Sequence, residues 1–330
     1  MTKVAINGFG RVGRAAFKVA LTKKNLRIVA INDLADINNL AYLLKYDTAH
    51  GKFDKKISVS GQHLVVNGRK FPVYSIADPA KLPWKKHKVN VALECTGAFR
   101  KTNEVKKHLT AGAKNVILSA PIKDEGVMTV VRGINDNNVK KEKAFANASC
   151  TTNCVSPIMA VLESAFGVEK AMLSTIHAVT SSQRTVDLAY EKDWRRGRSV
   201  LGNIIPTTTG AAIATGKVLP NLKGKFDGMS IRVPMITGSL VDVVALLKKN
   251  VTEKQVNQAF KKYSKMVHFK GVLEVSEDEL VSSDIIGTTA SAIVDLKFTK
   301  VVDGNLVKVL AWYDNEWGYA NRLVEMVEKV

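Results

Sequence analysis

Cysteine is scarce in this chain, since only Cys95, Cys150 and Cys154 occur among 330 residues. Three thiols exclude a disulfide-stabilised framework and fit a reducing compartment. The apolar runs are short and interrupted by charges such as Asp242, so no stretch is suited to span a membrane. A basic start followed by an apolar segment is also missing, and we therefore expect no secretory signal. These absences predict a cytoplasmic protein.

The sequence also lacks zinc-finger spacing, an RNP-like aromatic run, an Arg-rich tail and internal repeats, and no metal site is expected. Acidic residues are few relative to basic ones, 30 against 49, which gives a net charge of +19. Such a charge calls for an anionic partner, namely phosphorylated metabolites, nucleic acid or an anionic surface. The lysines are scattered, which favours an ordinary solvated surface. Weak binding to a polyanion or a cell surface stays open as a second role.

The N-terminal segment has the pattern of a nucleotide-binding unit. A short apolar strand at residues 3–7 runs into the G-x-G-x-x-G spacing of residues 8–13, and a helix follows. Those glycines permit a tight turn, close approach of the backbone to a pyrophosphate, and close packing of helix on strand. Asp33 ends a second buried strand, where its carboxylate can bind both ribose hydroxyls and repel a 2′-phosphate. The pattern therefore predicts a nucleotide-binding site, and Asp33 favours NAD over NADP. The alternative to a nucleotide-binding site is an ordinary glycine turn.

The first half of the chain alternates strands and helices. Residues 89–93 and 115–119 are nearly all apolar, as expected of parallel strands covered on both faces. Residues 51–74 alternate like a hairpin, with Asn67 and Gly68 as its turn. We expect a doubly wound α/β Rossmann domain for NAD over residues 1–149.

Past residue 149 the pattern changes to long strands, expected at residues 170–178, 226–233, 239–248, 291–299 and 305–313. Their spacing predicts mostly antiparallel pairing. At 330 residues with 46% apolar side chains, the chain is long enough for two cores. We expect an α+β catalytic domain over residues 150–314 and a terminal helix over 315–330 that packs back on the first domain.

The segment Ser-Cys-Thr-Thr-Asn-Cys at residues 149–154 joins a strand to an apolar-faced helix. Cys150 opens that helix, and Ser149 is a suitable N-cap. The positive end of the helix favours a thiolate, which makes Cys150 a candidate nucleophile. The alternative is a small buried thiol, and that interpretation suits Cys154 better, because it lies on the apolar face. Hydroxyls such as that of Thr151 suit an anion better than a core.

Two further stretches carry chemistry. His177 lies near a strand end; alone it is more often structural, but paired with Cys150 it is a candidate general base. Residues 207–210 are predicted to open a second hydroxyl-rich helix after Ile-Ile-Pro, where a phosphate could bind. Arginines such as Arg198 and Arg232 supply cations for bidentate phosphate contacts.

The combination resembles the phosphorylating, glycolytic-type glyceraldehyde-3-phosphate dehydrogenases along the whole chain. The segments that carry this resemblance are 7–11, 32–34, 45–47, 95–97, 119–121, 149–154, 206–212 and 312–316. Residues 149–154 are the most specific of them. The resemblance implies an NAD-dependent aldehyde dehydrogenase that converts glyceraldehyde 3-phosphate and inorganic phosphate to 1,3-bisphosphoglycerate. It also implies a homotetramer in which segment 187–198 reaches the neighbouring subunit's cofactor site.

The resemblance further implies residue roles. Cys150 would attack the aldehyde, His177 would act as the base, and a thioester would be cleaved by phosphate. Two anion sites would be formed by Ser149, Thr151, Thr209 and Gly210, and by Thr180, Arg198 and Arg232. NAD would be bound by Gly8, Gly10, Arg11, Val12, Gly13, Asp33, Ala77, Ser119, Asn315 and Tyr319.

Two positions depart from the family's pattern. Ala77 stands where the family commonly has Arg, so its adenine contact would come from the backbone. Ala189 stands where NAD-preferring relatives usually have Pro, and we therefore expect measurable activity with NADP beside preferred NAD. An erythrose-4-phosphate dehydrogenase is the nearest alternative enzyme, with a similar fold and cofactor.

Overall fold

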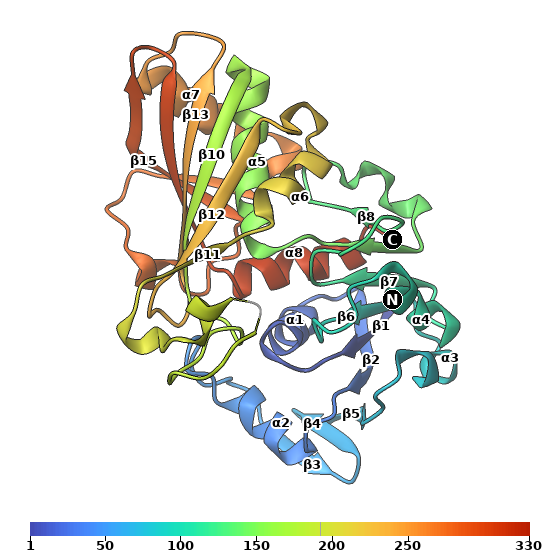
Figure 1. The fold of residues 1–330 in the computed structure, drawn as a ribbon. Helices are drawn as coiled ribbons and strands as arrows, with labels where there is room; N and C mark the ends of the chain where they lie inside the picture. Colours follow the sequence, from blue (N-terminus) through green and yellow to red (C-terminus); the bar gives the residue numbers. More distant parts are fainter. Residues whose placement is uncertain (192) are drawn as a thin grey trace. The chain divides into compact units, whose positions relative to one another are not determined.

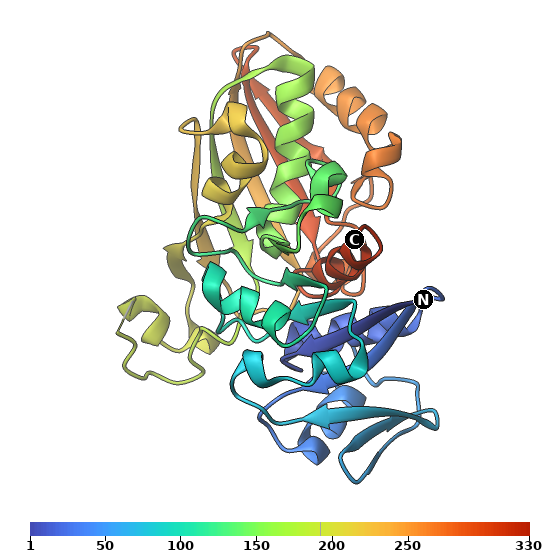
Figure 2. The same cartoon turned by 90° about the vertical axis from the view of Figure 1, so that its right-hand side faces the viewer.

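The computed structural model describes residues 1–191 and 193–330, with the backbone alone at residue 138 (Figures 1 and 2). The chain divides into two compact units. The first unit comprises residues 1–130, 136–148 and 320–330, and the second comprises 131–135 and 149–319. In the described part of the chain, no helix is long and apolar enough to cross a membrane.

The first unit is built on a nine-stranded sheet in the order β3-β4-β5-β2-β1-β6-β7-β9-β8. The strands are β1 Thr2–Asn7, β2 Leu26–Asn32, β3 Ile57–Ser60, β4 His63–Val66, β5 Arg69–Tyr74, β6 Val91–Glu94, β7 Asn115–Leu118, β8 Met128–Thr129 and β9 Ala144–Ala146. From β5 to β8 all neighbours are parallel, whereas β3, β4 and β5 pair antiparallel. The expected hairpin turn at Asn67 and Gly68 joins β4 to β5, and both residues have positive φ.

Helices connect the parallel strands of this unit. They are α1 Arg11–Leu21, α2 Ile37–Lys45, α3 Trp84–His87 and α4 Thr102–Thr110. The α1 helix buries its apolar face, including Phe17, against the sheet, where Phe17 packs edge-on against Phe71 of β5. The C-terminal residues contact the same unit, since Asn25 Nδ2 donates to Glu328 Oε1 at 2.9 Å. The carboxyl ends of β1, β2 and β6 meet at one edge of the sheet.

The second unit contains a seven-stranded sheet in the order β11-β12-β10-β13-β16-β15-β14. The strands are β10 Val168–His177, β11 Ile205–Thr208, β12 Phe226–Arg232, β13 Ser239–Leu247, β14 Leu273–Ser276, β15 Ala292–Val302 and β16 Leu306–Tyr313. Four of its pairs are antiparallel, and only β10 with β12 and β14 with β15 are parallel within the described residues.

The helices of the second unit cover one face of this sheet. They are α5 Cys150–Phe166, α6 Ala211–Val218 and α7 Glu253–Tyr263. A further helix, α8 Trp317–Val327, begins in the second unit, and its residues from Ala320 onward belong to the first unit. Val155, Ile158 and Leu162 of α5 lie in one core with Val243 and Val309 of the sheet. Short 3-10 helices are η1 Pro79–Lys81, η2 Asp136–Lys141, η3 Trp194–Gly197, η4 Val200–Gly202, η5 Pro220–Leu222, η6 Val267–Phe269 and η7 Ser282–Ile285.

The fold class expected from the sequence is confirmed. One local prediction is wrong: Thr207 and Thr208 do not open a helix but lie in β11, and α6 begins at Ala211 after Gly210. The reason is tertiary, because β11 is an edge strand held by β12, with Thr207 paired to Ser230. Strand β14 was not expected from the sequence.

Candidate active site

The thiol and the imidazole proposed from the sequence lie next to each other. Helix α5 begins at Cys150, and Ser149 caps it by accepting the backbone N–H of Thr152 at 3.1 Å. Strand β10 ends at His177, 27 residues further along the chain. Cys150 Sγ and His177 Nε2 are 3.4 Å apart. The pair therefore sits between a helix N-terminus and a strand end.

The second ring nitrogen of His177 is held by the backbone. Nδ1 lies 2.6 Å from the carbonyl oxygen of Ala178, which can only accept, although the Arg232 guanidinium, which can only donate, contacts the same nitrogen. The tautomer with its proton on Nδ1 satisfies the Ala178 carbonyl and leaves Nε2 free to take the thiol proton. Arg232 of β12 donates to the same carbonyl at 3.0 Å and also contacts His177 Nδ1. Burial and the Arg232 cation lower the pKa of His177 to about 3.

The charge state of the thiol differs from the sequence prediction. Burial raises the pKa of Cys150 above its ordinary value, and this outweighs the opposing effects of the Arg232 cation and the hydrogen bonds from Thr151. Helix position alone therefore does not produce a thiolate here, because desolvation disfavours the charged form. Both pKa shifts favour a neutral thiol beside a neutral imidazole in the structure as described.

Two buried threonines and Tyr313 lie beneath this pair. The Tyr313 hydroxyl is 2.9 Å from the Thr151 hydroxyl and 2.9 Å from that of Thr175. Its ring packs edge-on against His177, with centroids 5.9 Å apart. Tyr313 thus joins α5, β10 and β16. Sequence analysis missed this role, since only the segment 312–316 stood out, and nothing in it showed what the phenol contacts.

The candidate anion-binding groups fall on several loops. Gly210 is the N-cap of α6, and Thr209 Oγ1 accepts the backbone N–H of Ala211 at 3.2 Å. The Thr180 hydroxyl contacts Gln183 Oε1 and Ser182, each at 2.9 Å.

Two of the predicted hydroxyls also contact other side chains. The Thr151 hydroxyl lies 2.9 Å from that of Tyr313, and Thr207 bonds Arg196 and Asp193.

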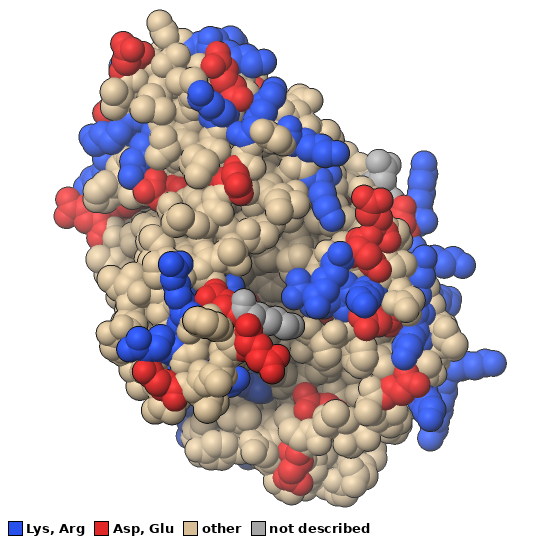
Figure 3. Space-filling view, in the orientation of Figure 1, with Lys and Arg blue, Asp and Glu red and all other residues tan. Residues whose placement is uncertain are grey.

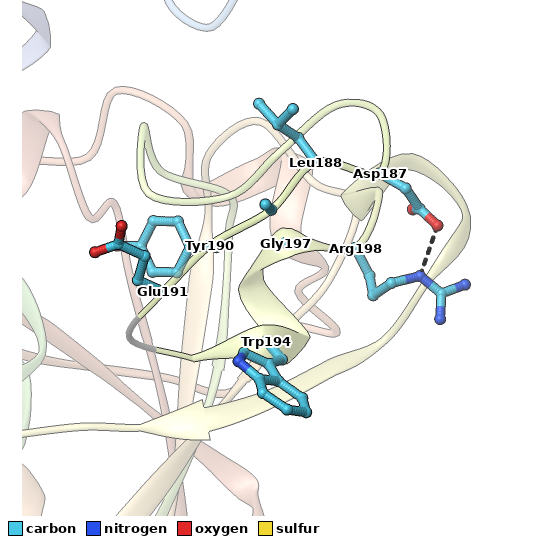
Figure 4. A pocket seen from close by; sticks show the side chains of 8 residues that line it. Asp187, Leu188, Tyr190, Glu191, Trp194, Gly197 and Arg198 are labelled. Atoms are coloured by element: carbon cyan, nitrogen blue, oxygen red, sulfur yellow. Dashed lines mark hydrogen bonds and ion pairs between the residues drawn. The ribbon is translucent and has the colours of Figure 1, made fainter.

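Arg198 belongs to a separate exposed loop. Its Nε donates to Asp187 Oδ2 at 2.8 Å, and both side chains are well exposed. Figure 4 shows this bond beside a pocket of about 610 Å³ to which Leu188, Tyr190 and Trp194 contribute. Ala189 lines the same pocket. The structure therefore does not join Arg198 to Thr180 or Arg232 by any contact among the described residues.

A second pocket, of about 310 Å³, lies at the carboxyl edge of the first unit's sheet. The residues that line it are Asn7, Gly8, Gly10, Asn32, Asp33, Leu34, Ile76, Ala77, Cys95, Thr96, Ala98 and Phe99. Gly8 has φ +90° and packs against the backbone of Thr96, while a Cβ on Gly13 would lie 2.0 Å from Gly8 O. Gly10 has open space around it and is the N-cap of α1. Gly8 thus permits the tight turn, Gly10 leaves room for a pyrophosphate to approach the backbone, and Gly13 permits close packing of the helix on the strand, as expected.

The other candidate cofactor residues of this unit are arranged around the same edge. Asp33 Oδ2 accepts the Phe9 N–H at 2.6 Å and Oδ1 accepts the Ala35 N–H at 2.9 Å, which fixes the carboxylate at the pocket. Ala77 lines the pocket next to Ile76. Arg11 and Val12 form the first turn of α1, but the Arg11 guanidinium is paired with Asp47 at 2.8 Å.

The remaining three candidates lie elsewhere. Ser119 follows β7, and its N–H donates to Glu94 O at 2.9 Å. Asn315 and Tyr319 are buried in the second unit, where Asn315 Oδ1 accepts from Ser239 at 2.8 Å. None of these three lines the 310 Å³ pocket.

Comparison with known proteins covers both halves of the chain. Residues 2–102 match the model for the glyceraldehyde 3-phosphate dehydrogenase NAD binding domain, and residues 149–315 match that for its C-terminal domain. A glyceraldehyde-3-phosphate dehydrogenase of Geobacillus stearothermophilus is 48% identical over 326 residues, which are 98% of this chain and 96% of the relative. Glyceraldehyde-3-phosphate dehydrogenase 2 of Kluyveromyces marxianus is 43% identical over 331 residues, 100% of this chain and 99% of the relative. The chain belongs to the glyceraldehyde-3-phosphate dehydrogenase family.

Proposed function

We propose that the chain oxidises glyceraldehyde 3-phosphate in the presence of NAD and inorganic phosphate, giving 1,3-bisphosphoglycerate and NADH. The observation that carries this proposal is the 3.4 Å approach of Cys150 Sγ to His177 Nε2 at the start of α5. A thiol with an adjacent base is the arrangement required for covalent attack on a carbonyl carbon. The relatives that bear the glyceraldehyde-3-phosphate dehydrogenase name cover almost the entire chain, whereas nothing favours an erythrose-4-phosphate dehydrogenase.

The chain's own groups account for the covalent steps. Cys150 Sγ bonds to the aldehyde carbon while its proton moves to His177 Nε2, and His177 then gives that proton to the former carbonyl oxygen, which yields a hemithioacetal and a neutral imidazole. Burial raises the pKa of Cys150 and lowers that of His177, which favours proton transfer together with attack. His177 then removes the hydroxyl proton as the carbon is oxidised, leaving a thioester on Cys150. A phosphate oxygen attacks the thioester carbon, the thiolate leaves, and the acyl phosphate is released.

NAD is the cofactor that fits the first unit. Gly10 leaves the N-terminus of the 11-residue helix α1 open, and that helix has no acidic residue in its first turn. Such a helix end suits the pyrophosphate, while Asp33 suits the ribose hydroxyls and the backbone at Ala77 suits the adenine. Bound NAD would supply a two-electron acceptor for the aldehyde carbon. We also propose Ser119, Asn315 and Tyr319 as contributors on the nicotinamide side.

Two anion sites are proposed for the substrate phosphate and the attacking phosphate. One comprises Ser149, Thr151, Thr209 and Gly210, and the other comprises Thr180, Arg198 and Arg232. The cap positions of Ser149 and Gly210 on α5 and α6 support the first site. The position of Arg232 beside His177 supports the second.

The function is tested by following NADH absorbance after addition of glyceraldehyde 3-phosphate, with and without inorganic phosphate. Rapid, sustained NADH formation is expected only with phosphate, because phosphate must clear the thioester. Erythrose 4-phosphate serves as the matched substrate. Equal turnover without phosphate, or faster turnover with erythrose 4-phosphate, would contradict the proposal.

We further propose that residues 1–149 form the NAD-binding domain, with helix 315–330 packed on it, and residues 150–314 the catalytic domain of a cytoplasmic homotetramer. Exposed apolar side chains support self-association. Met172 of β10 and Met229 of β12 are exposed on the second unit's sheet, and Leu188 and Trp194 are exposed on the loop in Figure 4. Sedimentation at several protein concentrations tests the tetramer, and a monomer at micromolar concentration would contradict it.

A weak polyanion-binding role is proposed beside catalysis. The net charge is +19, and Lys and Arg are spread over the face shown in Figure 3. Exposed lysines around α3 and α4 include Lys81, Lys85, Lys86, Lys88, Lys106 and Lys114. Binding to a polyanion should weaken steeply with added salt, because bound counterions are released on association. Salt-independent binding, or none at low salt, would contradict this role.

A further inference from the structure

A buried carboxylate stands at the centre of the first unit, outside the residues proposed for catalysis. Glu94 is the last residue of β6 and is fully buried. Four donors converge on it. Oε2 accepts from Asn7 Nδ2 at 2.5 Å and from His108 Nε2 at 2.9 Å, and Oε1 accepts from Thr96 N at 2.8 Å and from the Thr96 hydroxyl. All of its acceptor positions are thus directed at donors.

The orientation of His108 is fixed by a second buried residue. Trp84 Nε1 lies 2.9 Å from His108 Nδ1, and both side chains are fully buried. An indole N–H can only donate, so Nδ1 must accept and the ring proton must lie on Nε2, which donates to Glu94. The two rings are nearly parallel, at an interplanar angle of 14°. Trp84 of α3, His108 of α4 and Glu94 of β6 therefore form a hydrogen-bonded relay with one polarity.

The relay ends at the walls of the 310 Å³ pocket. Asn7, held by Glu94, accepts from Asn32 Nδ2 at 2.7 Å, and Asn32 bonds both the N–H and the carbonyl of Ile76. Thr96, also held by Glu94, packs its backbone against Gly8, whose Cβ would lie 2.6 Å from Thr96 N. Asn7, Asn32, Ile76 and Thr96 all line the pocket. One carboxylate thus fixes the ends of β1, β2 and β6 together.

We propose that Glu94, His108 and Trp84 are positioning residues that set the affinity of this pocket for NAD. The proposal rests on the proposed function, in that the pocket binds the cofactor. Loss of a hydrogen bond to a buried carboxylate is most destabilising when it leaves a buried donor without an acceptor. In the free protein, an unsatisfied donor can find another acceptor if the residues of the pocket wall move. Binding of NAD requires those residues to move back to the positions that they have in this structure. Loss of the relay should therefore weaken NAD binding more than it slows the reaction.

The test is calorimetric measurement of the NAD dissociation constant, together with kcat at saturating NAD. Glu94→Gln keeps the shape but replaces one acceptor by a donor, so at least one of the four donors faces another donor. We expect the dissociation constant to rise by about tenfold, with kcat changed less than about twofold. Val105→Ala is the matched control, since Val105 is buried on α4 within an apolar cluster that does not include the relay. It should lower the unfolding temperature and leave the dissociation constant unchanged.

A second pair of variants covers the possibility that Glu94→Gln does not fold. His108→Gln retains one donor and one acceptor and should bind NAD more tightly than His108→Leu, which retains neither. Wild-type protein that does not bind NAD would overturn the proposed function itself. Two results would overturn the positioning role alone, provided that the wild-type protein binds NAD. One is a dissociation constant of Glu94→Gln equal to that of the wild type, and the other is equal dissociation constants for His108→Gln and His108→Leu.

Discussion

The stability of the fold should depend on the protonation of His177. Its side chain is buried, and its pKa is lowered to about 3 by burial and by the Arg232 cation. In the unfolded chain the same imidazole has a pKa of about 6.5. The unfolded state therefore binds a proton as the pH falls below about 6.5, whereas the folded state does not until about pH 3. The free energy of unfolding is maintained above pH 6.5 and is lost progressively as the pH falls through this window.

The size of this loss follows from the two pKa values. Between pH 8 and pH 5, linkage gives about 2 kcal/mol for this one group, and the full shift corresponds to about 5 kcal/mol near pH 3. At pH 5 the folded imidazole is still almost wholly unprotonated, so the loss depends almost entirely on the unfolded chain. His177→Asn removes the titrating group and keeps a donor for the carbonyl of Ala178. The variant should lose about 2 kcal/mol less stability than the parent on going from pH 8 to pH 5.

The assay is urea unfolding at pH 8 and at pH 5 at one protein concentration, since self-association affects apparent stability. Cys150→Ser is the matched control, because it alters the same site and retains the buried imidazole. It should show the full pH dependence of the parent. An identical change in stability for the parent and for His177→Asn would refute the reasoning and would mean that His177 is protonated or exposed in the folded protein.

Further substitutions test the site. Cys150→Ser should abolish turnover and leave NAD binding, whereas Cys154→Ser should be milder, and iodoacetamide labelling of Cys154 first would show that the nucleophile is misassigned. His177→Asn should lower turnover by about 10² to 10⁴ and slow alkylation of Cys150, whereas unchanged rates would leave His177 structural. The unmutated protein is expected to prefer NAD over NADP by roughly 5- to 150-fold in kcat/KM, and Asp33→Gly should lower this preference. An unchanged ratio of the two kcat/KM values would mean that Asp33 does not contact the ribose. Tyr313→Phe should cost about 1 to 3 kcal/mol in urea unfolding, because Thr151 and Thr175 lose their shared partner, and an unchanged midpoint would contradict that bridge.

Local patterns were sufficient where the physical cause is local. The glycine spacing of residues 8–13 predicted a strand, a turn and a helix, because backbone conformation at a tight turn depends on the residues in it. The capping box of Thr252 and Gln255 marks the start of α7 for the same reason. Alternating and continuous apolar runs distinguished the mostly antiparallel second sheet from the parallel first one. Residues 149–154 likewise marked the start of α5 and its thiol.

Tertiary structure alone decided what faces each of these groups. Thr207 lies in an edge strand because β12 supplies its hydrogen-bond partners, which no local pattern specifies. The pKa of Cys150 is raised because the fold buries the thiol, although its position at a helix start favours the opposite shift. Glu94 and His108 are 14 residues apart, and their contact depends on how α4 packs on the sheet, where Val105 of α4 lies in one cluster with Val116 and Leu118 of β7. The sequence by itself determined which chemical groups are present and on which elements they lie, whereas burial and long-range contacts, which set their charge state and orientation, required the folded chain.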